Sequence, residues 1–214
     1  MIIVPSILTN NPEDLREMLR ICDGLVTKVQ IDIVDGVFFN NKTIFPDELK
    51  NIETDLLIDY HLMVKEPVNW VEKCVLGNGD QIIGQVEMMK AQSDFLGKTQ
   101  EVGLKVGLGL DVETELERLE KSILSDCDAI LVMNYPAGIG GQEFQPRSLA
   151  KIKRLAKLRK KTKSSFQIIS DGGVNAENIK SLFQAGCDEV VVGKSLFKGN
   201  FRQNLDELRL LSSQ

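Results

Sequence analysis

From one end to the other, the chain alternates between short runs of apolar, often β-branched residues and longer stretches whose apolar residues recur every three or four positions. The short runs predict strands, and the longer stretches predict amphipathic helices. The expected strands are residues 2–5, 25–34, 56–61, 81–86, 105–110, 129–133, 166–170 and 189–192. The expected helices are residues 12–22, 67–76, 91–102, 113–122, 146–160, 176–185 and 200–211, with a weaker helical signal over 47–52. Strands that alternate with helices in this way are typical of a parallel α/β sheet.

Two α/β architectures compete for such a pattern. Eight strand–helix repeats within 214 residues favour a closed (β/α)8 barrel, the TIM-barrel fold, near the lower limit of its usual size. A doubly wound open sheet is the alternative, and it usually carries a glycine-rich turn after its first strand. Here that turn, residues 5–9, reads PSILT and has no glycine. Because no linker interrupts the chain, we predict one α/β domain over residues 1–214, a single (β/α)8 TIM barrel.

Charge and composition exclude several classes of partner. The net charge of −5 argues against broad binding to nucleic acid. In the one strongly basic run, residues 151–163, apolar residues at helical spacing favour a solvated helix face over a polyanion patch. No apolar run approaches the ~20 residues that span a membrane, and we expect no signal peptide. The four cysteines show no CxxC spacing, so we expect reduced thiols in a cytoplasmic protein.

Two side chains at strand ends point to chemistry, because the reactive groups of such barrels lie at the carboxyl ends of the strands. Gln30 and Asp32 share one face of their strand, and Ile31 and Ile33 take the other. An inward carboxylate is costly to bury without a metal or a hydrogen-bond donor, so we favour a functional role over a structural one. His61, the single histidine, ends the next strand, and its place favours a ligand or acid–base role over a core position.

Glycines after the last two strands predict an anion site. Asp171 is followed by Gly172 and Gly173, and backbone N–H groups that lead into a helix form an anion cradle. Barrels recurrently bind phosphate in the loops after strands seven and eight. Gly193 and Lys194 fit the second half of that cradle, with Lys194 as an extra cation.

A third glycine segment follows the sixth strand. Gly138, Gly140 and Gly141 occupy three of four positions there, which suggests a mobile loop or one pressed against a ligand. The motif alone is weak. Its expected position on the same face as the anion cradle favours a lid that closes over a ligand.

Taken in order, these motifs resemble the ribulose-phosphate 3-epimerase family. The resemblance covers nearly the whole chain. It rests on segments 5–8 (PSIL), 32–36 (DIVDG), 41–44 (NKTI), 61–64 (HLMV), 138–144 (GIGGQEF) and 171–175 (DGGVN), and on Gly193 with Phe197. An ordered set of this kind is far more specific than any single motif.

The resemblance implies an isomerase of carbohydrate metabolism, in the pentose phosphate pathway, that inverts C3 of D-ribulose 5-phosphate to give D-xylulose 5-phosphate. It implies that Asp32 and Asp171 flank the substrate, one removing the C3 proton and the other delivering a proton to the opposite face. It also implies a divalent metal, commonly zinc, iron or manganese, held by these aspartates and two histidines, that steadies the cis-enediolate. The implied substrate-binding residues are Ser6, His61, Met63, Met133, Gly138, Ile139, Gly140, Gly141, Gly172, Gly173, Gly193 and Lys194.

Several positions depart from the family pattern. Gln30 stands where the family has its first metal-binding histidine, and Gln85 where it has another histidine of the site. Asp32, His61 and Asp171 remain as metal ligands. A Gln30 carbonyl oxygen is a poor zinc ligand compared with imidazole, so a harder ion such as manganese or magnesium becomes relatively more favoured.

Three functions remain open at this point. The first is an active epimerase on ribulose 5-phosphate, and the second is an epimerase of another ketose phosphate, such as a ketohexose 6-phosphate. The third is a phosphosugar-binding homologue that has lost the metal and much of its activity. A related group of barrels places a catalytic lysine two positions after the equivalent of Asp32, but this chain has Val34 there. Because the family is often dimeric or larger, we also expect a homo-oligomer.

Overall fold

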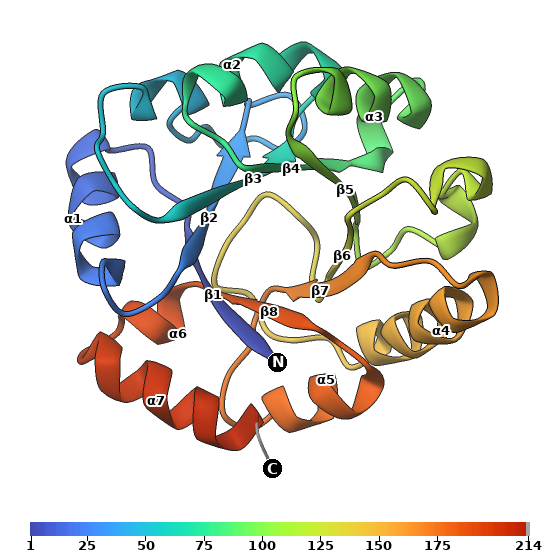
Figure 1. The fold of residues 1–214 in the computed structure, drawn as a ribbon. Helices are drawn as coiled ribbons and strands as arrows, with labels where there is room; N and C mark the ends of the chain where they lie inside the picture. The colour runs from blue at the N-terminus through green and yellow to red at the C-terminus, as the bar shows by residue number, and fades with distance from the viewer. Residues whose placement is uncertain (213–214) are drawn as a thin grey trace.

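Eight parallel strands follow one another around a closed barrel, and the last pairs with the first to complete it (Figure 1). In this computed structural model, residues 1–212 are described. The strands are β1 (Ile2–Ile7), β2 (Lys28–Val34), β3 (Leu57–Met63), β4 (Gln81–Gln85), β5 (Lys105–Leu110), β6 (Ala129–Met133), β7 (Gln167–Asp171) and β8 (Glu189–Val192). The predicted α/β fold and its (β/α)8 topology are confirmed.

The longer helices surround the barrel (Figure 1). The helices are α1 (Pro12–Cys22), α2 (Val71–Leu76), α3 (Gln92–Glu101), α4 (Arg147–Thr162), α5 (Ile179–Ala185), α6 (Lys194–Phe197) and α7 (Phe201–Ser212). Short 3₁₀ turns are η1 (Pro46–Leu49), η2 (Pro67–Trp70), η3 (Val86–Met88), η4 (Leu116–Arg118) and η5 (Lys121–Ile123). The weak helical signal over residues 47–52 thus corresponds to the single turn η1. Within residues 1–212, no helix combines the length and the apolar character needed to cross a membrane.

The helix expected over residues 113–122 is wrong. Two separate turns, η4 and η5, occupy this stretch, and Leu119 between them is extended. The side chain of Gln92 explains the break, because it accepts a hydrogen bond from Glu120 N and donates one to Arg118 O. Backbone groups that are bonded to a side chain are not available for the hydrogen bonds of a continuous helix.

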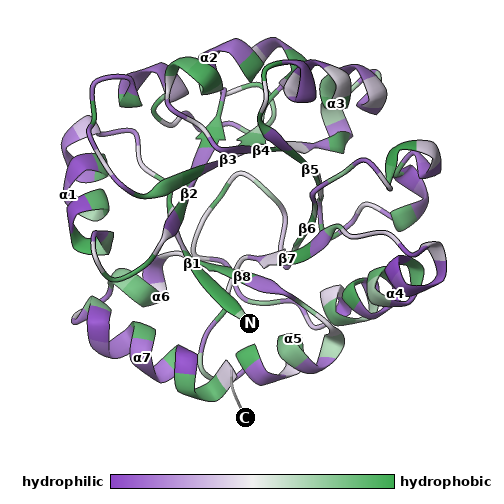
Figure 2. Ribbon diagram, in the orientation of Figure 1, coloured by the Kyte–Doolittle hydropathy of each residue, from purple (hydrophilic) through white to green (hydrophobic). Residues whose placement is uncertain are grey.

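Apolar side chains form one layer on each face of the strands. Residues such as Ile31 and Ile33 pack outward against the helices, and residues such as Val34 and Met63 fill the interior of the barrel. Figure 2 shows hydrophobic and hydrophilic residues together on the outer helices, as expected for helices that bury one face on the barrel. Alternation along β2 therefore turns the polar side chain of Asp32 into the interior, as predicted.

The basic run 151–163 lies mainly on α4, and most of its lysines and arginines are exposed. This agrees with the predicted solvated helix face. Lys151 is the exception, because it is buried and its Nζ donates to Asp111 O at 2.7 Å and to Val112 O at 3.1 Å. That contact fixes the loop after β5 against α4.

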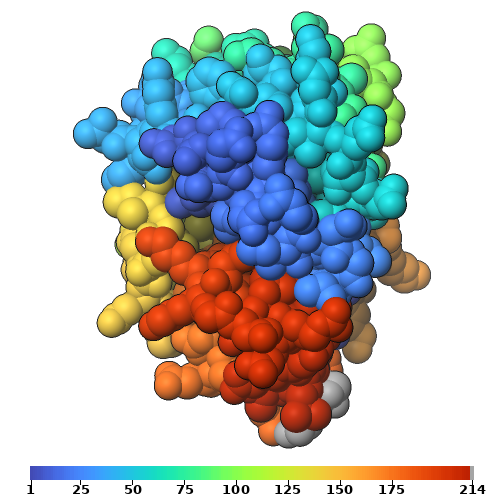
Figure 3. Space-filling view, turned by 90° about the vertical axis from the view of Figure 1, so that its left-hand side faces the viewer, coloured from blue at the N-terminus to red at the C-terminus, as the bar shows by residue number. Residues whose placement is uncertain are grey.

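The two ends of the chain meet on one side of the molecule. Figure 3 shows the blue N-terminal segment resting on the red C-terminal helices, with the yellow segment near residue 140 beside them. Arg209 Nη2 donates to Leu25 O at 2.9 Å. The last helix is therefore bound to the segment that precedes β2.

Candidate functional site

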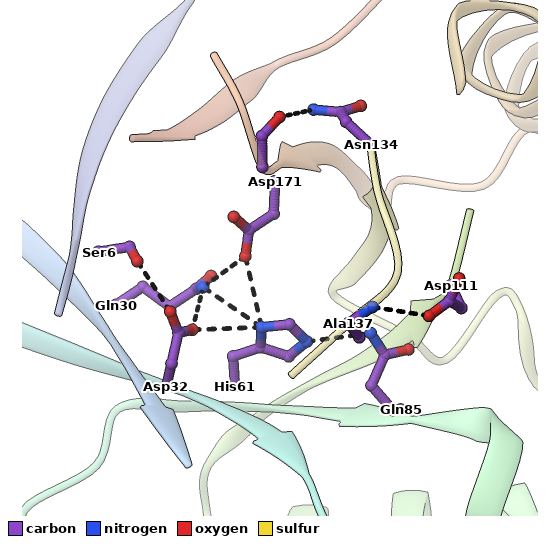
Figure 4. A network of polar contacts seen from close by, with 10 residues as sticks. Ser6, Gln30, Asp32, His61, Gln85, Asp111, Asn134, Ala137 and Asp171 are labelled. Carbon is purple, nitrogen blue, oxygen red and sulfur yellow. Dashed lines mark hydrogen bonds and ion pairs between the residues drawn. The ribbon is translucent and has the colours of Figure 1, made fainter. Parts of the chain in front are cut away.

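Four polar side chains from different strands meet at the carboxyl end of the barrel (Figure 4). Ser6 comes from β1, Asp32 from β2, His61 from β3 and Asp171 from β7. The register pairs Asp32 with His61 on adjacent strands, so their side chains leave the sheet together. These are four of the positions that the sequence singled out, and all four are buried.

Asp32 accepts hydrogen bonds on both carboxylate oxygens. Ser6 Oγ donates to Oδ2 at 2.8 Å, and Gln30 Nε2 donates to Oδ1 at 2.7 Å. The same Gln30 nitrogen donates to Asp171 Oδ2 at 2.8 Å. The two aspartates therefore share one amide group, although β2 and β7 are separated around the barrel by β1 and β8.

His61 lies between the same two carboxylates. Its Nδ1 is 3.3 Å from Asp32 Oδ1 and 3.4 Å from Asp171 Oδ2. Burial would lower the pKa of His61, but hydrogen bonds and attraction to Asp171 and Asp32 outweigh it and raise the pKa to about 9. Burial raises the pKa of Asp171, and the nearby charge of Asp32 adds to this, against hydrogen bonds from His61 and Gln30.

The far side of the His61 ring faces Gln85. Gln85 Nε2 is 3.2 Å from His61 Nε2, while its Oε1 is buried without a hydrogen-bond partner among the described residues. Exchanging the oxygen and nitrogen of this amide would let Oε1 accept the Nε2–H of His61. Nδ1 is then the ring nitrogen left to face the carboxylates.

The donor set fits a divalent cation. One ligand atom each from Asp32, His61 and Asp171 lies within 4.8 Å of the others. Three protein ligands with an open position are typical of catalytic metal sites. A ligating histidine usually donates its second N–H to a neighbouring acceptor, and the unpartnered Gln85 oxygen is suited to that role. This geometry does not select the ion.

A cavity of about 1070 Å³ opens above these residues. Its lining includes Ser6, Asp32, His61, Met63, Met133, Gly138, Ile139, Gly140, Gly141, Asp171, Gly172, Gly173, Gly193 and Lys194. The structure thus brings together around one space every residue that the sequence placed in the site, apart from Gln30. Gln30 lies beneath the two aspartates at 1% exposure.

The glycine segments lie close to other parts of the cavity wall. A Cβ at Gly172, where φ is +106°, would come within 2.7 Å of the Tyr135 ring. A Cβ at Gly141 would lie 3.0 Å from Lys194 Nζ. A side chain would therefore clash with the ring at Gly172, whereas at Gly141 the flexible Lys194 side chain could move aside. The Lys194 ammonium lies beside the segment expected to form a lid.

The segment 137–142 is held at its start by Asp111, whose Oδ2 accepts a hydrogen bond from Ala137 N at 2.8 Å. Asn41 Nδ2 donates to Gly138 O at 3.4 Å, and a Cβ at Gly138 would meet Phe39 at 2.5 Å. The loop after β2 therefore packs on this segment at the mouth of the cavity.

Tyr135 is a cavity residue that the sequence prediction missed. Its ring lies against Gly172, and the side chain is 7% exposed. Burial raises the pKa of its hydroxyl, and the charges of Asp171 and Asp32 raise it further, so the group stays a neutral phenol. Alternation from Leu131 and Met133 on β6, continued past the strand end, would have found it.

Comparison with known proteins identifies the family of the chain. Residues 2–197 match the model of the ribulose-phosphate 3 epimerase family. Ribulose-phosphate 3-epimerase from Synechocystis is 33% identical over 92% of this chain and 87% of its own, and that from Bacillus subtilis is 30% identical over 97% of each. The solved 3-hexulose-6-phosphate synthase from Salmonella typhimurium shares the fold, with a TM-score of 0.70 at 13% identity over 100% of this chain and 99% of its own. The chain belongs to the ribulose-phosphate 3-epimerase family.

Proposed function

We propose that this chain is a ketose-phosphate 3-epimerase that interconverts D-ribulose 5-phosphate and D-xylulose 5-phosphate by proton transfer between Asp32 and Asp171. The observation that carries the proposal is that both carboxylates accept a hydrogen bond from the same Gln30 nitrogen beneath one cavity. Inversion at one carbon requires a base on one face and an acid on the other. Two carboxylates that converge on one space from different strands meet that requirement.

The reaction begins when one aspartate removes the C3 proton. The electrons of the broken C3–H bond form the double bond to C2, and the carbonyl oxygen takes up the negative charge, which gives a cis-enediolate. The other aspartate then donates its proton to the opposite face of C3, and the carbonyl reforms. Asp171, whose pKa burial raises, suits the role of proton donor in one direction. Asp32 accepts hydrogen bonds from Ser6 and Gln30 and suits the role of base. The positioned pair would contribute about 10²–10⁴-fold to the rate.

The phosphate group would bind at the glycine segments. Gly172, Gly173 and Gly193 bring backbone to the cavity without side chains, and Lys194 adds a positive charge. Met63 and Met133 line the same cavity and would cover the planar enediolate. The segment 138–141 would close over the substrate and exclude water.

Asp32, His61 and Asp171 would hold a divalent cation, which when bound stabilises the developing oxyanion as a Lewis acid. Because the site has one imidazole and no second one, we expect manganese or magnesium to compete better against zinc than in a site with two histidines. Iron is the further candidate. Metal analysis of the purified protein tests this, and stoichiometric zinc that survives dialysis would refute it.

A larger ketose phosphate, such as a ketohexose 6-phosphate, is the second candidate substrate. The cavity of about 1070 Å³ slightly exceeds the roughly 300–1,000 Å³ usual for small-molecule sites, which leaves room for a further carbon. A substrate panel that compares kcat/KM for the pentose and hexose phosphates separates the two.

Solvent deuterium exchange tests the proposed chemistry directly. An active epimerase washes deuterium into C3 of ribulose 5-phosphate, and Asp32→Asn or Asp171→Asn should abolish the exchange. Asp59→Asn is the matched control, because Asp59 is also buried but pairs with Lys28 away from the cavity. Wild-type protein that binds the phosphosugar without exchange would instead support the phosphosugar-binding homologue.

We further propose a cytoplasmic protein that acts on a small phosphorylated ketose and binds neither nucleic acid nor membranes. The four cysteines are buried free thiols, which is usual in a reducing compartment. The expected homo-oligomer stays a prediction. Light scattering at several protein concentrations would test it.

A further inference from the structure

The amide nitrogen of Gln30 donates hydrogen bonds to both Asp32 and Asp171. A primary amide has two N–H donors, and Gln30 Nε2 lies 2.7 Å from Asp32 Oδ1 and 2.8 Å from Asp171 Oδ2. Each carboxylate therefore receives one donor. A single side chain of β2 thus reaches across the interior of the barrel to β7 (Figure 4).

The two carboxylates need such a bridge. Like charges close together in a buried site repel one another, and hydrogen bonds to ionised acceptors are among the strongest in proteins. With the amide reversed, Gln30 Oε1 would face both carboxylates and add to the repulsion. The orientation with the nitrogen toward Asp32 and Asp171 is therefore the one that the site selects without a cation.

The same hydrogen bonds from Gln30 oppose the binding of a cation to the two carboxylates. To offer Oε1 as a ligand, the Gln30 amide must turn over and give up both hydrogen bonds. A cation that instead binds only Asp32, His61 and Asp171 competes with the amide for Asp32 Oδ1 and Asp171 Oδ2, the oxygens that His61 Nδ1 also faces. Either path weakens the affinity for the ion.

We infer that Gln30 is a positioning residue that cross-links Asp32 and Asp171 through its amide, so that the pair stays assembled without a divalent cation and the bridge competes with the cation for both carboxylates. The catalytic half of this inference rests on the proposed function. The structural half, that the bridge competes with the cation, does not.

Gln81 provides a matched control. It is a buried glutamine on β4 whose Nε2 donates to a buried carboxylate, Asp59 Oδ2, at 3.3 Å. It does not line the cavity. Gln30→Met and Gln81→Met each remove an amide while keeping side-chain length, so a difference between them reports the site rather than the loss of a buried polar group.

The experiment compares wild type, Gln30→Met, Gln30→His and Gln81→Met, each stripped with a chelator. Stripped Gln30→Met should have a kcat about 10–100-fold below that of stripped wild type and stripped Gln81→Met, with little change in KM, and Mn²⁺ should remove most of this difference. Calorimetric titration with Mn²⁺ and with Zn²⁺ should show about tenfold tighter binding to Gln30→Met than to wild type, because the competing bridge is gone.

Gln30→His is the second variant, in case Gln30→Met folds poorly. The ring nitrogens of its imidazole point in different directions, unlike the two N–H groups on one amide nitrogen. It should therefore bridge the two carboxylates less well and depend more on a cation, and it should retain zinc through dialysis. If chelation reduces the kcat of wild type as much as that of Gln30→Met, that result overturns the inference. Equal cation affinities in the two proteins would also overturn it. Wild type that epimerises nothing under any condition would remove the proposed function, and the titrations would still decide whether the bridge competes with the ion.

Discussion

Gln85 Nε2 lies 3.2 Å from Nε2 of His61, the ring nitrogen on the side away from Asp32 and Asp171. The amide of β4 is therefore the group that can fix which nitrogen of the histidine carries hydrogen. A ring held in one tautomer presents the same nitrogen to a ligand each time. Gln85, at a position where the family pattern has a histidine, is thus placed to orient His61.

Gln85→Leu removes this partner by replacing the amide with an apolar side chain of similar size. We expect affinity for Mn²⁺ to fall about 10–100-fold, since the ligand ring loses its orienting contact. Calorimetric titration measures the affinity, and Gln81→Leu controls for the loss of a buried amide in the same strand. An affinity unchanged from wild type would contradict the role of Gln85.

Gly172→Ala tests the close approach of Tyr135 to the proposed phosphate site. Gly172 has φ of +106°, and a Cβ there would lie 2.7 Å from the ring of Tyr135. We expect KM for the phosphosugar to rise about tenfold or more, because a shift of an ångström in a positioning group has effects of this size or larger. Unfolding free energy should also fall by more than the roughly 1–2 kcal/mol expected for a left-handed alanine alone.

Gly24→Ala is the control for Gly172→Ala. Gly24 has φ of +67°, and nothing lies within 4 Å of a Cβ built there. It therefore isolates the backbone strain from the clash, and KM should stay at the wild-type value. Equal losses of stability in the two variants, measured by urea unfolding, would show that Tyr135 tolerates the added methyl group.

An ion pair near the amino-terminal ends of β2 and β3 leads us to predict that stability depends on pH. Asp59 is buried beside Lys28, which also contacts Glu189. Burial raises the pKa of Asp59 from 3.8 to about 6, although Lys28 opposes the shift. Because the folded pKa lies above the unfolded one, the favourable contribution of Asp59 is complete below pH 3.8 and is lost as the pH rises through about 6.

Asp59→Asn removes that titration. Wild type should therefore lose about 3 kcal/mol of unfolding free energy relative to the variant between pH 4 and pH 7, the equivalent of about two pKa units. Urea unfolding at several pH values measures the difference between the two proteins. A difference that stays constant across this range, or that favours wild type as the pH rises, would contradict the raised pKa.

Much of the fold follows from sequence periodicity. Buried apolar residues recur at different spacings in the strands and in the helices of a barrel, so each type of element can be recognised from the sequence. The prediction failed over residues 113–122, where a helical pattern is interrupted by Gln92, a side chain more than twenty residues earlier in the chain. Local patterns contain no information on such a distant contact. For the same reason the sequence could turn Gln30 inward but could not show that its amide reaches Asp171.

The candidate site was predictable where position along a strand was enough. Asp32, His61 and Asp171 lie at strand ends, and barrel closure brings all such ends to one face. Tyr135 was missed because the strand prediction stopped at Met133, although the alternation of inward residues continues beyond it. The end of this strand was predicted correctly, since β6 ends at Met133. The course of the backbone beyond it depends on distant contacts such as that of Tyr135 with Gly172, which a single sequence does not reveal.

Lys194→Met tests the charge of the proposed phosphate site. Lys194 lines the cavity, and its Nζ lies 3.0 Å from a Cβ position built at Gly141. Since its ammonium would face the substrate phosphate before and after proton transfer alike, its loss removes binding shared by ground and transition states. We expect KM to rise about tenfold while kcat changes little, and competitive inhibition by inorganic phosphate to weaken by a similar factor.

Lys198→Met is the control for Lys194→Met. Lys198 also lines the cavity and is exposed, as Lys194 is, but it follows α6 and so shares the charge without the approach to Gly141. Raising the ionic strength should reduce the difference between wild type and Lys194→Met, because salt screens an accessible charge pair. A KM increase that is equal in both variants would mean that net positive charge near the mouth matters, and that Lys194 makes no specific contact. A fall in kcat at unchanged KM would instead place Lys194 in the chemical step.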